Sequence, residues 1–153
     1  MNQAETNRGS RRVVSRAGRA SASPVPGVLD LLAAARRGLS EAMLEPRPGE
    51  RYAAAHLAAL RGAAAVLAAR AHPAPGRRGP RSAWELLALA APEMTEWATF
   101  FAAGAGKRAA AEAGLDVVSS READDLLRDA ETFLALVDTT LGVPHQTALP
   151  RVS

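Results

Sequence analysis

The spacing of apolar residues is the feature that most constrains this chain, because it keeps the period of an α-helix over long segments. In one such segment the stripe runs through Val28, Leu31, Leu32, Ala35 and Leu39, which places these residues on a single helical face. Alternation of apolar and polar residues, which marks a half-buried strand, does not persist over any useful length. The sequence therefore predicts an all-α protein.

Residues that start and end helices divide the chain into its expected elements. Ser82 and Ser119 each stand three residues before a glutamate, the pattern of a capping box. Gly142, with a proline soon after it, is typical of a helix end, and the pair Gly104 and Gly106 predicts a break. The expected helices span about 27–45, 50–71, 82–91, 92–103 and 119–141, with a short helical turn at 107–113. These lengths and the short connections favour a four- to five-helix bundle.

The apolar composition indicates how such a bundle packs. Apolar residues make up 48% of the chain and aromatic residues only 4%, so alanine supplies much of the apolar content. Alanine triplets at 53–55 and 63–65 would allow a neighbouring helix to approach closely. The main aromatic residues follow the apolar period, which favours a place in the core over a base-stacking surface; they are Trp84, Trp97, Phe100 and Phe101.

Positive charge is concentrated outside the predicted helices. Residues 1–24 are polar, carry five arginines against Glu5 alone, and are predicted to be a disordered basic arm before a bundle domain at 25–143 and a flexible tail at 144–153. A second cluster surrounds the loop after residue 70. Such segments either bind nucleic acid through its phosphates or only add solubility. The candidate nucleic-acid contacts are Arg11, Arg12, Arg16, Arg19, Arg70, Arg77, Arg78 and Arg81.

Targeting signals are not expected. Ser10-Arg11-Arg12-Val13-Val14 is similar to a twin-arginine export motif, but the apolar stretch of about 7–15 residues that an export signal requires does not follow it. No run approaches the roughly 18 consecutive apolar residues of a membrane helix. We expect a cytoplasmic protein with no membrane partner.

Several kinds of catalytic and metal chemistry are excluded or disfavoured by composition. The chain contains no cysteine, and its three histidines, His56, His72 and His145, are far apart in sequence, so neither a metal site nor another cofactor is expected. Acidic residues gather at the start of the last predicted helix, opposite its apolar stripe, and are predicted to form a solvated surface. These residues are Glu122, Asp124, Asp125 and Asp129.

One pair of residues is a candidate for catalysis. Arg51 and His56 have four residues between them, and an arginine can stabilise a scissile phosphate while a histidine acts as general acid or base on a ribose hydroxyl. A five-residue step on a helix rotates by about 140°, however, so the two side chains diverge. His56 also shares a face with Tyr52 and Leu60, where a hydrogen-bonded core histidine is the alternative.

Two helical segments resemble HEPN domains (higher eukaryote and prokaryote nucleotide-binding). They are Tyr52-Ala-Ala-Ala-His-Leu-Ala-Ala-Leu-Arg61 and Asp124-Asp-Leu-Leu-Arg-Asp-Ala-Glu-Thr-Phe-Leu134. The intervening Pro80-Arg-Ser-Ala-Trp-Glu-Leu-Leu looks like a branch of the superfamily found in high-GC bacteria. The resemblance covers about residues 27–142 and implies a bundle that commonly forms a homodimer.

The resemblance also implies two kinds of function. Many HEPN proteins are metal-independent ribonucleases, often toxins or defence effectors, in which an arginine and a histidine a few residues apart are paired across the dimer; Arg51 and His56 fit that spacing. The family usually has a polar residue after the arginine, where this chain has Tyr52, which favours a divergent or non-catalytic member. Three hypotheses follow: a non-catalytic or divergent module that binds nucleic acid, a nucleotide or a protein partner; a metal-independent ribonuclease; and a bundle for protein interaction only.

Overall fold

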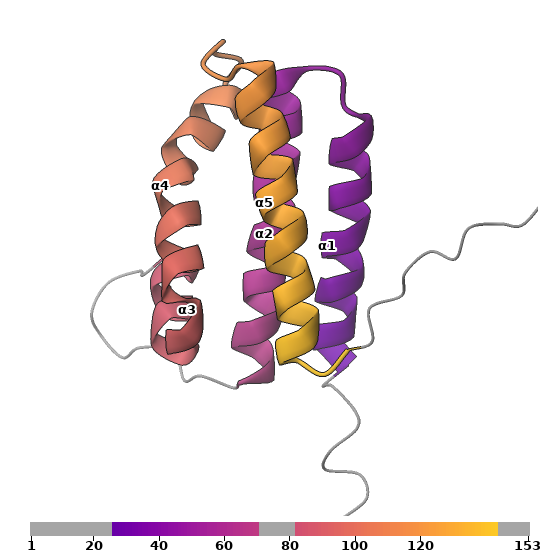
Figure 1. Cartoon of the computed structure of the whole chain (residues 1–153), viewed down its shortest axis with the longest axis vertical. Coiled ribbons are helices and arrows are strands. Elements are labelled where there is room, and N and C mark those ends of the chain that lie inside the picture. Colours follow the sequence, from indigo (N-terminus) through magenta and orange to yellow (C-terminus); the bar gives the residue numbers. More distant parts are fainter. Residues whose placement is uncertain (1–25, 71–81, 144–153) are drawn as a thin grey trace, which may run out of the picture.

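The computed structural model describes residues 26–70 and 82–143, and in this part of the chain every regular element is helical (Figure 1). The elements are α1 (Pro26–Leu44), α2 (Pro48–Ala69), α3 (Ala83–Ala90), a short 3-10 turn η2 (Pro92–Met94), α4 (Thr95–Glu112) and α5 (Ser120–Thr140). The long helices run side by side, and α3 lies at the end of the bundle opposite the α1–α2 and α4–α5 connections. The predicted all-α bundle is confirmed, whereas the predicted arm at 1–24 and tail at 144–153 lie outside the described residues.

α2 is the central helix, since it packs against α1, α3, α4 and α5. Most of its buried residues are small, and they are Ala55, Ala58, Ala59, Gly62, Ala63 and Ala65. A Cβ atom on Gly62 would lie only 2.4 Å from Cδ2 of Leu134 on α5, so the Leu134 side chain packs into the space that the missing Cβ atom leaves free. α2 is also long and apolar enough to cross a membrane by length and composition alone, but its central position accounts for that composition.

Aromatic side chains fill the space between α3, α4 and α5. The rings of Trp84 and Phe101 stack with their centroids 5.0 Å apart, and Phe133 lies 5.2 Å from Phe101. The prediction that Phe100 also belongs to the core is wrong, because 44% of its surface is exposed. Adjacent residues on a helix point about 100° apart, so Phe100 and Phe101 do not face the same way, and Phe101 is the one buried in the core.

The predicted break at Gly104–Gly106 is also wrong, because α4 continues without interruption from Thr95 to Glu112. The helix therefore includes the segment expected as a separate turn at 107–113. Gly104 faces α2, and a Cβ atom there would lie 2.7 Å from Tyr52 Oη and 3.4 Å from His56 Cδ2. Gly104 thus provides clearance for two side chains of α2. A Cβ atom on Gly106 would meet nothing within 4 Å.

Both predicted capping boxes start helices, although only the second is complete. The Ser82 hydroxyl accepts a hydrogen bond from the Glu85 backbone N–H (3.2 Å). At the start of α5, the Glu122 N–H donates to Ser119 Oγ (3.1 Å), and the Ser119 N–H donates to Glu122 Oε2 (2.8 Å). The second box fixes the direction of the Glu122 side chain, which faces α4.

Substituting the two α4 glycines tests these different roles. Gly106→Ala adds only helix propensity and is expected to raise the free energy of unfolding by up to about 1 kcal/mol. Gly104→Ala brings the same gain but forces the buried Tyr52 side chain to shift, so it is expected to be about 1–3 kcal/mol less stable than Gly106→Ala. Urea denaturation of both variants measures this difference, and equal stabilities would contradict the assigned packing role.

Candidate functional site

His56 lies in the interior of the bundle with none of its surface exposed. Its ring packs edge-on against Trp84 and Phe101, with both centroid distances 5.8 Å. Nε2 lies 2.8 Å from the backbone carbonyl oxygen of Phe101, and Nδ1 lies 3.4 Å from Nη1 of Arg108. Both ring nitrogens therefore face protein atoms.

The partners of His56 determine its tautomer. A carbonyl oxygen only accepts and a guanidinium only donates, so Nε2 carries the proton and Nδ1 accepts from Arg108. Burial lowers the pKa of His56, the hydrogen bond to Phe101 opposes that shift, and the charge of Arg108 adds to it. The arrangement favours a neutral histidine that joins α2 to α4.

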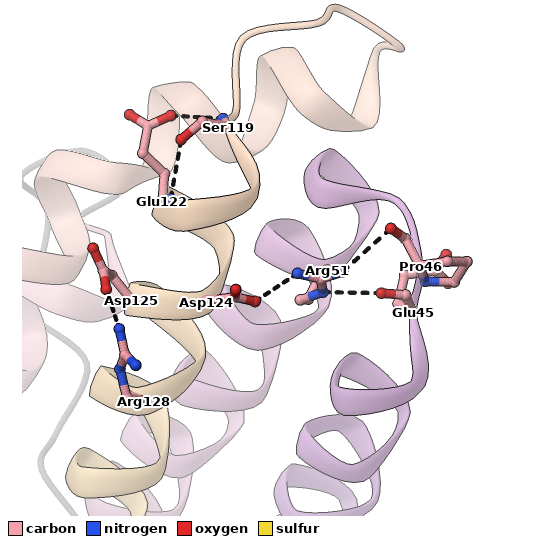
Figure 2. A network of polar contacts seen from close by, with 8 residues as sticks. All are labelled: Glu45, Pro46, Arg51, Ser119, Glu122, Asp124, Asp125 and Arg128. Carbon is pink, nitrogen blue, oxygen red and sulfur yellow. Dashed lines mark hydrogen bonds and ion pairs between the residues drawn. The ribbon is translucent and has the colours of Figure 1, made fainter.

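Arg51 connects the α1–α2 turn to α5, as Figure 2 shows. Its Nε donates to the carbonyl oxygen of Glu45 (2.9 Å) and its Nη2 to that of Pro46 (3.2 Å). Nη1 lies 2.5 Å from a carboxylate oxygen of Asp124. The guanidinium thus satisfies carbonyl groups just beyond the end of α1, which have no helical partner, and all three of its nitrogens are engaged.

The structure does not bring Arg51 and His56 to a common site. Arg51 contacts α5 and the α1–α2 turn, whereas His56 points into the core and contacts α4. The arginine beside His56 is Arg108, which is distant in sequence, so the sequence offers no local signal for that contact. A catalytic role for Arg51 and His56 remains a prediction from their spacing along the chain. The contacts that both side chains make in the structure hold helices together.

Of the predicted nucleic-acid contacts, only Arg70 lies among the described residues. Its Nη1 donates to the carbonyl oxygen of Ala90 (3.0 Å), and its Nη2 pairs with the Glu93 carboxylate. Arg70 therefore fastens the end of α2 to the α3–η2 connection. The other candidates, Arg11, Arg12, Arg16, Arg19, Arg77, Arg78 and Arg81, lie outside the described residues.

A groove of about 450 Å³ lies between α4 and α5, with α2 beneath it. We call it the α4–α5 groove, and it is lined by Tyr52, Phe100, Ala103, Gly104, Lys107, Glu122, Asp125, Leu126 and Asp129. Three of the four acidic residues that were expected on a solvated surface thus form one wall of a groove. The fourth, Asp124, points instead to Arg51 (Figure 2).

Tyr52 supplies a polar group to the groove from a buried ring. Only 7% of its surface is exposed, and within the described part of the chain its hydroxyl has no hydrogen-bond partner. Burial raises the pKa of Tyr52, the charge of Lys107 lowers it, and the charge of Glu122 raises it. The pKa therefore keeps the phenol protonated at neutral pH, so it can both donate and accept.

The charged residues of the groove differ in how far they are neutralised. Glu122 pairs with Lys107 (2.5 Å), and that hydrogen bond together with the Ser119 backbone N–H lowers the pKa of Glu122 to about 2. Asp125 pairs with Arg128 (Figure 2).

Asp129 makes no ion pair within residues 26–70 and 82–143. Burial raises its pKa, the charge of Asp125 raises it further, and the charge of Arg128 opposes this. Asp129 therefore adds to the groove a carboxylate that has no ion-pair partner in the described part of the protein. No group of three or more side chains in that part is arranged to hold a metal ion.

The fold and these contacts define the protein as a helical bundle. Its Arg51 and His56 side chains hold helices together, and a separate groove lies between α4 and α5. The family model for SAV_6107-like HEPN domains matches residues 42–138, which is more than half of the chain. The chain belongs to this HEPN family. No curated protein and no solved structure matches it.

The structural role of Arg51 is open to a direct test. Arg51→Ala leaves two carbonyl groups and Asp124 without their donor and is expected to lower the free energy of unfolding by about 2 kcal/mol. Arg121→Ala is the matched control, since that side chain is 91% exposed and 3.9 Å from its carboxylate partner, and is expected to change stability by less than about 0.5 kcal/mol. Equal effects in chemical denaturation would contradict the role.

Proposed function

We propose that this chain is a non-catalytic HEPN module that acts by binding, and that the α4–α5 groove is its binding site. The observation that carries this proposal is the complete burial of His56, with both ring nitrogens directed at protein atoms. A general acid or base must come within hydrogen-bond reach of the proton that it transfers. His56 would have to leave the aromatic core to do so.

Arg51 supports the same proposal. For phosphate binding its guanidinium would have to release backbone carbonyl groups and Asp124. The exchange costs most at the Glu45 carbonyl oxygen, since that contact is partly buried whereas the contacts with Pro46 and Asp124 are exposed. The groove offers polar groups that need no such rearrangement, since Tyr52 Oη and the Asp129 carboxylate line it and lack hydrogen-bond or ion-pair partners in the described residues.

RNA cleavage tests the non-catalytic assignment. Purified protein and its His56→Gln variant are incubated with total RNA in EDTA, next to a known metal-independent ribonuclease. We expect neither form to cleave RNA, because the histidine cannot reach the substrate. Cleavage that leaves 2′,3′-cyclic phosphate ends and disappears in a folded His56→Gln protein would establish the ribonuclease alternative.

A second candidate function is RNA binding through the basic segments. The observation that favours it is the concentration of arginine in residues 1–24, with five arginines against one glutamate. Phosphate groups would be repelled from the acidic α4–α5 groove, and Arg70 is already paired with Glu93. This function therefore depends on residues 1–24 and the loop arginines rather than on the bundle.

Deletion of residues 1–24 distinguishes RNA binding by the basic segments from ligand binding by the α4–α5 groove. If five arginines contact a single strand, the logarithm of the binding constant should fall with the logarithm of salt concentration with a slope of about −3.5. We expect the truncated protein to lose most of this RNA affinity and to keep the melting temperature of the bundle. RNA affinity that does not change with salt concentration would exclude this route, and affinity that survives the deletion would exclude a role of residues 1–24 and leave the loop arginines as the contacts.

A further inference from the structure

The Tyr52 hydroxyl is a polar group that the described protein places in a groove without giving it a partner. Only 7% of the surface of Tyr52 is exposed, and its hydroxyl lines the α4–α5 groove next to Gly104. The hydroxyl oxygen itself reaches the open space of the groove, because among the described residues the fully buried side-chain atom without a hydrogen-bond partner is Arg108 Nε. A phenylalanine would fill the same core position without presenting a hydroxyl to the groove.

Gly104 preserves the space around this hydroxyl. A Cβ atom at residue 104 would lie 2.7 Å from Tyr52 Oη, so any larger residue would press on the hydroxyl or displace it. A glycine inside a helix is less favourable than alanine by about 1 kcal/mol. Gly104 therefore lowers the stability of α4 at the point where the Tyr52 hydroxyl opens into the groove.

The charged residues of the groove indicate the sign of the charge that a ligand would carry. Its wall on α5 presents Glu122, Asp125 and Asp129, and its only basic lining residue is Lys107, which is paired with Glu122. Asp129 has no ion-pair partner in the described segments, and its pKa is raised by burial and, further, by repulsion from the nearby charge of Asp125. A cation would relieve that repulsion, whereas an anion would add to it.

The remaining lining residues indicate an apolar part of the ligand. Phe100 lies in the groove with 44% of its surface exposed, and Leu126 and Ala103 complete an apolar strip. An aromatic face attracts a guanidinium or ammonium group as well as an apolar stem. The volume of about 450 Å³ lies in the range of small-molecule sites.

We propose that the α4–α5 groove binds an organic cation, namely a guanidinium or ammonium group carried on an apolar stem. N–H groups of the cation donate to the Asp129 carboxylate and to Tyr52 Oη, and the stem lies on Phe100 and Leu126. This inference rests on the proposed binding role of the groove and adds the chemical class of its ligand. The cation is either a free small molecule or a side chain of a partner protein.

An NMR titration of the full chain tests the proposal. The probes are butylguanidinium and a short capped peptide with one arginine between two leucines, and pentanoate serves as the charge-reversed control. We expect saturable shifts at residues of the groove with at least one cationic probe and none with pentanoate. Binding of butylguanidinium indicates a free ligand, and binding of the peptide alone indicates a side chain of a partner protein.

Three variants show whether the named groups bind the cation. Tyr52→Phe and Asp129→Asn should each weaken binding about tenfold, since each removes a hydrogen bond to a charged group. Glu131→Gln removes the same charge from α5 outside the groove and should leave binding unchanged. Tyr52→Phe should keep the melting temperature of the ligand-free protein, because its hydroxyl has no partner within the described structure.

The outcomes separate this inference from the proposed function. Absence of binding by both cationic probes, or binding that is equal in the wild type, Tyr52→Phe and Asp129→Asn, overturns the cation site. RNA cleavage measured on the same preparation reports on the non-catalytic assignment. If cleavage and cation binding are both absent, only the ligand class fails, whereas His56-dependent cleavage overturns the proposed function itself.

Discussion

Close packing of small side chains around α2 is the constraint on which the rest of the structure depends. α2 contacts every other helix, so its sides cannot all carry large residues without forcing the bundle apart. Alanine loses no side-chain entropy on burial, and glycine allows the nearest backbone approach. At Gly62 the neighbouring Leu134 occupies the place that a Cβ atom would need. The tryptophan and phenylalanine residues of the core come from α3, α4 and α5, while α2 contributes the rings of Tyr52 and His56.

The same constraint explains why the arginine and histidine of α2 have separate structural contacts. A central helix turns most of its residues toward protein, so His56 requires hydrogen-bond partners inside the core and finds them on α4. Arg51, in the first turn of α2, lies where the backbone of α1 ends and leaves carbonyl groups without partners. The spacing of these residues satisfies a family motif, but each side chain is engaged in holding two elements together.

The α4–α5 groove is a consequence of how α4 is held. α4 packs on α2 and α3, and it meets α5 through the ring contacts of Trp97 and Phe101 with Phe133 and, further along, through the ion pair of Lys107 with Glu122. The capping box at the start of α5 fixes Glu122 for that pair. With no larger side chain at Gly104, the space between the two helices stays open down to Tyr52. The groove thus joins a buried phenol to the acidic, partly solvent-exposed surface of α5.

Much of the fold was predictable from local sequence. The apolar period, the serine–glutamate caps and the proline–glycine connections predicted the helices to within about two residues at most ends, because these signals act over one or two turns. The main misjudged element was α4. Glycine is an ambiguous signal: the same residue can end a helix or admit a neighbour, and only the position of Tyr52 shows which applies to Gly104.

The candidate site was much less predictable. Tyr52 comes from α2, Phe100 from α4 and Asp129 from α5, and no spacing along the chain relates them. The sequence alone determined the helical class, most of the helix ends, the family resemblance and the concentration of arginine in residues 1–24. Only the tertiary structure decided which of the acidic residues line a groove, that Phe100 is exposed and that His56 is sealed in the core. The reason is physical: helix formation depends on neighbours a few residues away, whereas burial and pairing depend on which helices meet.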